Sequence, residues 1–206
     1  MAVPEIRWIV FDLGNVLVDL ASGGTERLSK SLGIETEELH SFLLEVDASR
    51  RLCTGEFQAD QFTAMLNRRF GGSVTPQAIT ALFGPEIAAV YPAIPAIVES
   101  LAGRYSLGVL SNTFFGHWDY FIATDLAKSF SALMASHLMG CVKPDPLIYQ
   151  KALAQIAAAP EETLFVDDRE ENVAGARAAG MHSFQSLSPD ETVRGLMELG
   201  IAVNGK

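Results

Sequence analysis

Residues 9–18 read IVFDLGNVLV, and this stretch decides the fold. It opens with an apolar run of strand-forming residues, which is typical of a strand buried on both faces of a parallel sheet. Asp12 follows directly, and Gly14 and Asn15 then indicate a turn. A carboxylate at the mouth of a buried strand costs free energy unless a partner neutralises it. Because ligands of open α/β sheets bind at the carboxyl ends of the strands, Asp12 is a candidate for chemistry.

The composition is that of an ordinary globular protein. The chain has 206 residues, of which 49% are hydrophobic and 19% charged, enough for one domain with a sizeable insertion. The net charge of -10 argues against a nucleic-acid or anionic-membrane partner, because either would need a basic surface. Cys53 and Cys141 form neither a zinc motif nor a disulfide framework, which favours a reducing compartment. Since the pattern shows no signal peptide and no membrane span, we expect a cytoplasmic protein.

The periodicity of the apolar residues divides the chain. Between residues 20 and 95 they recur at helical spacing, as at Leu28 and Leu32, and Thr75–Pro76 marks a helix start, so we expect a small bundle of helices. From residue 96 onward, short apolar runs alternate with helical segments, which predicts βαβ units and a parallel sheet. Strands are expected at 105–110, 129–136, 163–166 and 181–185, and helices at 96–102, 145–156, 172–180 and 189–199.

Polar side chains follow three of the expected strands. Asp12 ends the first, Ser111 and Asn112 end the second, and Asp167 and Asp168 end the third. Because the carboxyl ends of parallel strands lie at one edge of a sheet, these side chains can converge although they are far apart in sequence.

Lys143 adds a cation to this set. It lies in GCVKPDP, residues 140–146, where two prolines stiffen a turn ahead of a helix. Crowded carboxylates raise one another's pKa unless a cation neutralises them, and hard oxygen ligands of this kind suit magnesium. A lysine, a serine hydroxyl and backbone N–H groups suit a phosphoryl group. We therefore expect Mg²⁺ and a phosphorylated small molecule at this edge, with Asp12 as the carboxylate nucleophile.

Four pieces of the sequence resemble the motifs of the haloacid-dehalogenase-like superfamily, specifically of its phosphatase branch. They occur in the family order across residues 6–185 and read FDLGNVL, LSNT, KPDPLIY, and FVDD followed by ENVAGARAAG. The resemblance implies an α/β fold with a Rossmann-like, doubly wound parallel sheet as the core, formed by residues 1–19 and 96–206. It also implies an inserted all-helical cap, formed by residues 20–95.

The resemblance further implies a role for each matched residue. Asp12 would be the nucleophile, and Ser111 and Lys143 would complete the catalytic set. Substrate would be held by Ser111, Asn112, His117 and Lys143. The metal would be held by Asp12, the carbonyl oxygen of Gly14, Asp167 and Asp168.

Gly14 departs from the family pattern. Most phosphatases of the family have a second aspartate two residues after the nucleophile, which serves as general acid and base. Gly14 keeps a carbonyl oxygen for the metal but cannot protonate a leaving group. The combination of FDLGNV with SNT and the following His117 is similar to the subgroup of bacterial α-glucose-1-phosphate phosphatases. Because an anomeric oxygen is a better leaving group than an ordinary alcohol, we expect a sugar phosphate such as a hexose 1-phosphate.

Two residues near the expected site have two interpretations each. His117 either supplies the missing proton or is a solvated loop histidine. Asn15 either orients the nucleophile or favours the turn, and the turn is the simpler explanation.

Three other functions fit parts of the pattern. A haloacid dehalogenase would use Asp12 without a metal, and the pair Asp167 and Asp168 argues against it. A phosphomutase would depend on the acid that Gly14 replaces. A catalytically weak module that binds phosphate or a metabolite would fit the loss at Gly14 but has little use for a nucleophile. We therefore expect a magnesium-dependent phosphatase that hydrolyses a small phosphomonoester through an aspartyl-phosphate, as a monomer or homodimer.

Overall fold

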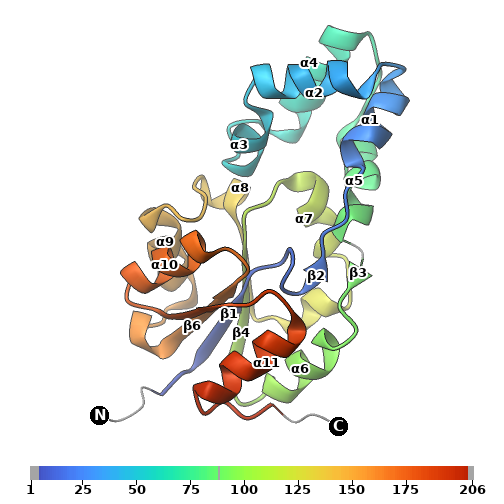
Figure 1. Ribbon diagram of the computed structural model, residues 1–206. Coiled ribbons are helices and arrows are strands. Elements are labelled where there is room, and N and C mark those ends of the chain that lie inside the picture. Colours follow the sequence, from blue (N-terminus) through green and yellow to red (C-terminus); the bar gives the residue numbers. More distant parts are fainter. Residues whose placement is uncertain (1–4, 88, 204–206) are drawn as a thin grey trace.

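A five-stranded parallel sheet lies at the centre of the computed structural model, which describes residues 5–87 and 89–203 (Figure 1). Its strand order is β5-β4-β1-β6-β7, so the chain winds from β1 to one edge and then returns to wind toward the other. This doubly wound α/β sheet confirms the predicted fold class, and the direction of winding reverses beside β1. The terminal residues 1–4 and 204–206 of the predicted core lie outside the described residues. The strands are β1 Trp8–Phe11, β4 Ser106–Ser111, β5 Ala132–Ala135, β6 Thr163–Asp167 and β7 His182–Gln185.

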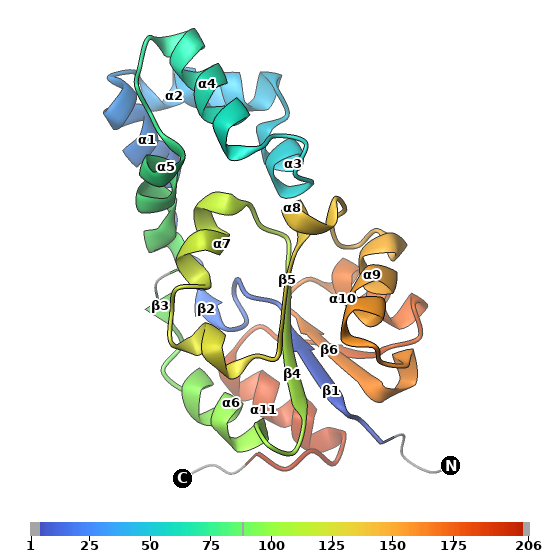
Figure 2. The ribbon, with the colours of Figure 1, turned by 180° about the vertical axis from the view of Figure 1, so that it is seen from behind.

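Helices cover both faces of the sheet because each strand alternates its apolar side chains between them. Ile9 and Phe11 face α6, α7 and α11, whereas Val10 faces α9 and α10. Figure 2 shows α6 and α11 on one side of the strands and α9 and α10 on the other. The bounds are α6 Ile94–Leu101, α7 Phe115–Phe121, α8 Ser136–Met139, α9 Pro146–Ile156, α10 Glu170–Ala178 and α11 Pro189–Glu198.

Three helices begin where the sequence places a capping residue before a proline. The side chains of Thr75, Asp145 and Ser188 each accept a hydrogen bond from a backbone N–H in the first turn of α5 (Pro76–Phe83), α9 and α11, respectively. In each case proline occupies the start of the helix, where its missing N–H costs nothing.

Five helices from the first half of the chain form a separate group, which we call the helical unit (Gly24–Phe83). Figure 1 shows it beyond the carboxyl ends of the strands. It has an apolar core of its own, to which Phe114 and Phe115 of the sheet-bearing part contribute. The two connections to the sheet lie side by side, because β2 (Val18–Asp19) pairs antiparallel with β3 (Ala89–Val90). The helices are α1 Gly24–Leu32, α2 Thr36–Glu45, α3 Ala48–Cys53, α4 Ala59–Phe70 and α5 Pro76–Phe83.

The structure contains elements that the sequence pattern did not predict. These are α3, α7, α8, three short 3₁₀ helices and the β2–β3 pair. Helix α7 reads FGHWDYF, in which aromatic residues on several faces obscure the helical period. The strand expected at 129–136 is shorter and spans Ala132–Ala135, because residue 129 belongs to the 3₁₀ helix Leu126–Ser129. The other two 3₁₀ helices are Gly84–Ile87 and Pro160–Glu162. Within the described residues, none of the helices has the length and apolar character needed to cross a membrane.

The apolar core of the helical unit gives a test of the fold. Leu66 of α4 is 0% exposed, whereas Leu44 of α2 is 69% exposed. We expect Leu66→Ala to lower the free energy of unfolding by ~2–5 kcal/mol, because it leaves a cavity. The control Leu44→Ala should change it by less than ~0.5 kcal/mol. Urea denaturation measures both, and equal effects would contradict this packing.

Candidate active site

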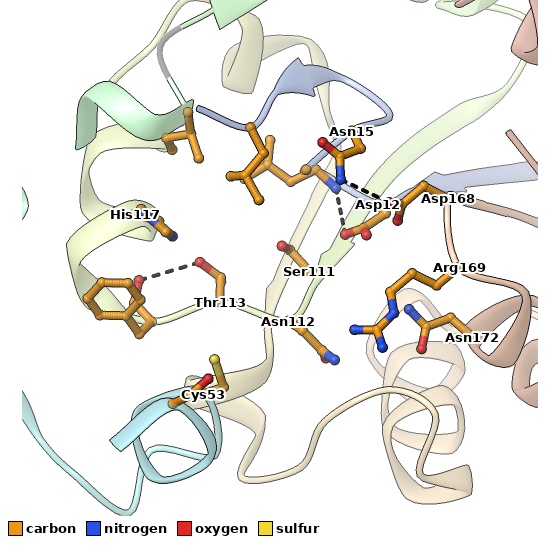
Figure 3. Close-up of a pocket in the computed structure, with 16 residues that line it drawn as sticks. Asp12, Asn15, Cys53, Ser111, Asn112, Thr113, His117, Asp168, Arg169 and Asn172 are labelled. Carbon is orange, nitrogen blue, oxygen red and sulfur yellow. Dashed lines mark hydrogen bonds between the residues drawn. The ribbon is translucent and has the colours of Figure 1, made fainter. Parts of the chain in front are cut away.

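A cavity of about 330 Å³ lies at the carboxyl ends of the strands, between the sheet and α3 of the helical unit (Figure 3). It is the position at which an α/β sheet of this winding binds its ligands. The lining combines polar groups from the strand ends with residues of the helical unit and the segments that join it. Its residues are Asp12, Leu13, Gly14, Asn15, Leu20, Ser49, Cys53, Ile87, Ser111, Asn112, Thr113, Phe114, His117, Asp168, Arg169 and Asn172.

Lys143 lies directly behind this cavity, with a side chain that is 0% exposed. Its Nζ lies 2.9 Å from Oδ1 of Asp12 and 2.6 Å from Oδ2 of Asp167, and it donates to the carbonyl oxygen of Leu110 at 2.8 Å. These three oxygen atoms match the three donors of an ammonium group. In this arrangement Lys143 contacts Asp12, and the predicted contact of Lys143 with phosphate stays a prediction.

Burial and charge oppose each other in this network. Burial raises the pKa of Asp12 to about 6, against the attraction of Lys143, and the nearby Asp167 adds to the rise. Burial also acts to lower the pKa of Lys143, but the carboxylates of Asp12 and Asp167 outweigh it and hold that pKa above its usual value. Lys143 is therefore charged at neutral pH and favours the ionised form of Asp12.

The second carboxylate of the network, Asp167, is held at both oxygens. Oδ2 accepts from Lys143, while Oδ1 accepts from the backbone N–H of Arg169 at 2.9 Å and from Nδ2 of Asn172 at 2.8 Å. The residue is 0% exposed. Its position indicates that it fixes and neutralises Lys143, and its predicted role as a direct metal ligand stays a prediction.

Asp168 faces the cavity, and Asn15 holds it. Nδ2 of Asn15 donates to Oδ2 of Asp168 at 3.0 Å, and Asn15 itself adopts a left-handed conformation with φ 58° (Figure 3). Asn15 thus favours the turn, as predicted, and also orients an acidic side chain, although that side chain is Asp168 and not Asp12.

The donor set of this site fits a magnesium ion. Carboxylate oxygens of Asp12, Asp167 and Asp168 all lie within 4.8 Å of one another. Oδ2 of Asp12 and Oδ1 of Asp168 accept no hydrogen bond from the residues that the structure describes. One or two carboxylates together with water and phosphate oxygens are what Mg²⁺ takes in enzymes of this kind.

The end of β4 supplies a hydroxyl and a fixed amide. Ser111 is the last residue of β4 and lines the cavity. The side chain of Asn112 lines it too, but it is engaged by the backbone of Lys143, donating to the carbonyl oxygen at 2.9 Å and accepting from the N–H at 2.8 Å. Asn112 therefore positions Lys143, and its predicted contact with substrate stays a prediction.

Gly14 lines the cavity, and space does not dictate that it is a glycine. A Cβ atom added there would have Leu20 Cδ2 as its nearest neighbour, at 3.6 Å, which is an ordinary contact. A Cβ atom therefore fits at this position. Space at Cβ does not require glycine, so the missing acid group is a chemical property of the site.

His117 is in helix α7 and lines the cavity, so the interpretation as a solvated loop residue is wrong. Its Nε2 lies 2.8 Å from Oε2 of Glu86, and the two side chains are 18% and 13% exposed. Sequence analysis missed Glu86, because nothing in the local pattern around it indicates a contact 31 residues away.

The helical unit reaches the sheet-bearing part beside the cavity. Ser49 and Cys53 of α3 line it, and Gly55 lies against α8. Gly55 has φ 72°, and a Cβ there would lie 2.1 Å from the carbonyl oxygen of His137, so only glycine permits this approach. Burial raises the pKa of the Cys53 thiol to about 11, which makes it a poor nucleophile.

At the point where the winding of the parallel sheet reverses, the site combines a carboxylate that contacts a buried lysine with oxygen atoms that suit a metal ion. Enzymes can use such a carboxylate as a nucleophile. The comparison with protein families is more specific. The chain belongs to the haloacid dehalogenase-like hydrolases, whose family pattern matches residues 6–180.

Several curated relatives are named as phosphatases, and two of them match most of this chain. The chain is 27% identical over 195 residues to glyceraldehyde 3-phosphate phosphatase of Methanopyrus kandleri, covering 85% of this chain and 82% of that protein. It is 24% identical over 211 residues to D-ribitol-5-phosphate phosphatase of Bacteroides thetaiotaomicron, covering 97% and 99%. It is also 25% identical over 209 residues to acyl-CoA dehydrogenase family member 10 of Mus musculus, covering 94% of this chain but only 19% of that protein.

Solved structures share the whole fold. A HAD-like family hydrolase of Porphyromonas gingivalis has a TM-score of 0.77 at 28% identity, covering 96% of this chain and 98% of that chain. The HAD family enzyme bt-2542 of Bacteroides thetaiotaomicron, solved in complex with magnesium and inorganic phosphate, has a TM-score of 0.72 at 21% identity, covering 87% and 93%. At that identity the second likeness concerns the fold alone.

The buried network gives a second prediction. Lys143→Met removes the cation and leaves Asp12 and Asp167 facing each other, so we expect the free energy of unfolding to fall by ~3–5 kcal/mol. The control Lys128→Met removes a lysine that is 74% exposed and should have little effect. Chemical denaturation of the metal-free protein compares them, and a small effect at both positions would contradict the network.

Proposed function

We propose that this chain is a magnesium-dependent phosphatase that transfers the phosphoryl group of a small phosphomonoester to Asp12 and then to water. The observation that supports this most strongly is the pairing of Asp12 with buried Lys143 at a cavity that also presents Ser111 and Asp168. Such a pairing makes little sense in a module that only binds, because it prepares a carboxylate for attack.

The first step follows from how Asp12 is held. Leu13 N–H and Lys143 both engage Oδ1 of Asp12, which leaves Oδ2 for phosphorus. The bond between Oδ2 and phosphorus forms as the ester bond breaks and the leaving oxygen departs with its electron pair. Ser111 lines the cavity, and its hydroxyl would hold a phosphoryl oxygen. Water then attacks phosphorus, which releases phosphate and restores the Asp12 carboxylate.

The metal would complete the charge balance of the site. Asp168, the carbonyl oxygen of Gly14 and the Asp12 oxygen that does not attack phosphorus would hold magnesium, with Asn15 orienting Asp168. When bound, the ion supplies positive charge that stabilises the phosphoryl oxygens in the transition state.

The helical unit would act as a cap over this reaction. Its α3 contributes Ser49 and Cys53 to the cavity, and Gly55 makes the close approach to His137 that brings the two parts together. A closed cap excludes bulk water and selects the substrate.

The substrate we propose is a sugar phosphate such as a hexose 1-phosphate. Gly14 offers no acid, so an ester with a comparatively good leaving oxygen is favoured. The relatives named as glyceraldehyde 3-phosphate and D-ribitol-5-phosphate phosphatases support a small polyhydroxy substrate. A haloacid dehalogenase is the weaker alternative: the solved dehalogenase of Pseudomonas syringae has a TM-score of 0.63 at 21% identity, which concerns the fold alone. A halide-displacing site would also have no use for the acidic cluster around Asp168.

Phosphate release from a panel of hexose and triose phosphates, with p-nitrophenyl phosphate as reference, tests the proposal. We expect release that requires magnesium and is abolished in Asp12→Asn, because the amide cannot form the acyl-phosphate. The highest kcat/KM should belong to a sugar 1-phosphate.

Each result of the panel has a separate meaning. Release from p-nitrophenyl phosphate but from no sugar phosphate would contradict the proposed substrate class. It would still be consistent with hydrolysis of a phosphomonoester. Folded wild-type protein that releases no phosphate from any ester would contradict the phosphatase function itself. Full activity of Asp12→Asn would contradict the role of Asp12 as the nucleophile.

A further inference from the structure

We propose that His117, held in place by Glu86, donates the proton to the leaving oxygen of the phosphomonoester and so fills the role that Gly14 cannot. The proposal rests on the phosphatase function above and adds to it one catalytic residue and one positioning residue.

His117 lies across the cavity from the nucleophile. Figure 3 shows its ring on one side of the cavity and Asp12 and Asp168 on the other, with Ser111 between them. Displacement at phosphorus is roughly in line, so the leaving oxygen of an ester attacked by Asp12 points away from Asp12. In-line attack by Asp12 would therefore direct the leaving oxygen toward the side of the cavity that His117 lines.

One ring nitrogen of His117 is engaged and the other is left for a substrate. Nε2 lies 2.8 Å from Oε2 of Glu86, and because an ionised carboxylate only accepts, Nε2 carries the hydrogen. Nδ1 makes no hydrogen bond to the residues that the structure describes. The rings of Phe114 and Phe83 pack against the imidazole, with centroids 4.7 Å and 6.0 Å from it, and limit its rotation.

Glu86 is itself fixed by the start of helix α1. Its Oε1 accepts from the backbone N–H of Gly24 at 2.6 Å and lies 4.0 Å from the guanidinium of Arg27. A Cβ on Gly24 would lie 2.5 Å from Phe83 Cδ1 and 2.9 Å from Oε1 of Glu86, so this contact depends on glycine.

The charge of Glu86 suits this role. Burial acts to raise the pKa of Glu86, but hydrogen bonds from His117 and Gly24 outweigh it and hold that pKa below its usual value. A carboxylate that anchors one nitrogen of an imidazole while the other transfers a proton is a recurring catalytic arrangement.

The proton transfer balances over the two steps. As Asp12 forms its bond to phosphorus and the ester bond breaks, the proton on Nδ1 of His117 moves to the leaving oxygen, and its electron pair stays on the nitrogen. The products are a neutral alcohol, the aspartyl-phosphate and neutral His117. In the second step His117 takes a proton from the attacking water, whose oxygen bonds to phosphorus as the bond to Asp12 breaks.

The test compares esters whose leaving groups differ in their need for a proton. We expect His117→Asn to lose ~10²–10⁴-fold in kcat on an alkyl or sugar phosphate. On p-nitrophenyl phosphate, which leaves as a stabilised anion, the loss should be much smaller. The dependence of kcat on the pKa of the leaving group should therefore become steeper. His182→Asn is the matched control, since His182 lies on the edge strand β7 and does not line the cavity.

Two further variants separate proton transfer from binding. Glu86→Gln keeps a hydrogen-bonding side chain but loses the charge, and it should steepen the leaving-group dependence in the same direction with a smaller loss of kcat. Gly14→Asp, whose Cβ would make only an ordinary contact with Leu20, should restore part of the alkyl phosphate activity when it is added to His117→Asn.

Opposite results would overturn the proposal. If His117→Asn raises KM and leaves kcat unchanged, or loses equal activity on both kinds of ester, His117 does not donate the proton. An unchanged rate on alkyl phosphates would have the same meaning. Wild-type protein without activity on any ester would instead overturn the phosphatase function on which this proposal rests.

Discussion

The ammonium group of Lys143 is out of reach of water, and the arrangement of the site depends on that fact. A buried charge costs several kcal/mol unless partners compensate for it. Asp12 and Asp167 supply the compensating charges, and the carbonyl oxygen of Leu110 completes the set. The partners come from neighbouring strands β1, β6 and β4, so the cation joins the sheet where its winding reverses. The same contact that makes burial of Lys143 tolerable also keeps Asp12 ionised and aimed.

Two adjacent aspartates at the end of β6, Asp167 and Asp168, have different positions and therefore different uses. Asp167 is enclosed, with Asn172 and Lys143 on its oxygens, whereas Asp168 is oriented by Asn15 and faces the cavity. The sheet thus provides a rigid set of oxygen atoms for a metal and a phosphoryl group. The opposite wall is formed by α7 and by residues of the helical unit and its connections. In the proposed function these parts would meet the organic portion of the substrate.

Sequence analysis predicted the sheet, and it predicted that Asp12, Ser111 and Asp168 would meet, because strand ends share one edge. It also placed Lys143 beside them. It could not predict the contact between His117 and Glu86, since two distant segments form it and the aromatic-rich helix α7 has no clear period. Asn112, Asn15 and Asp167 were found as site residues, but their partners decide what they do, and those partners become visible only in the folded chain.

The central claim is that Asp12, held by Lys143, is the nucleophile whose carboxylate oxygen bonds to phosphorus. Beryllium trifluoride mimics a phosphoryl group on a carboxylate, and ¹⁹F NMR detects it when bound. With magnesium present, we predict bound fluorine signals for the wild-type protein that are absent for Asp12→Ala. Bound signals that persist in Asp12→Ala, or none with folded wild-type protein, would contradict the account.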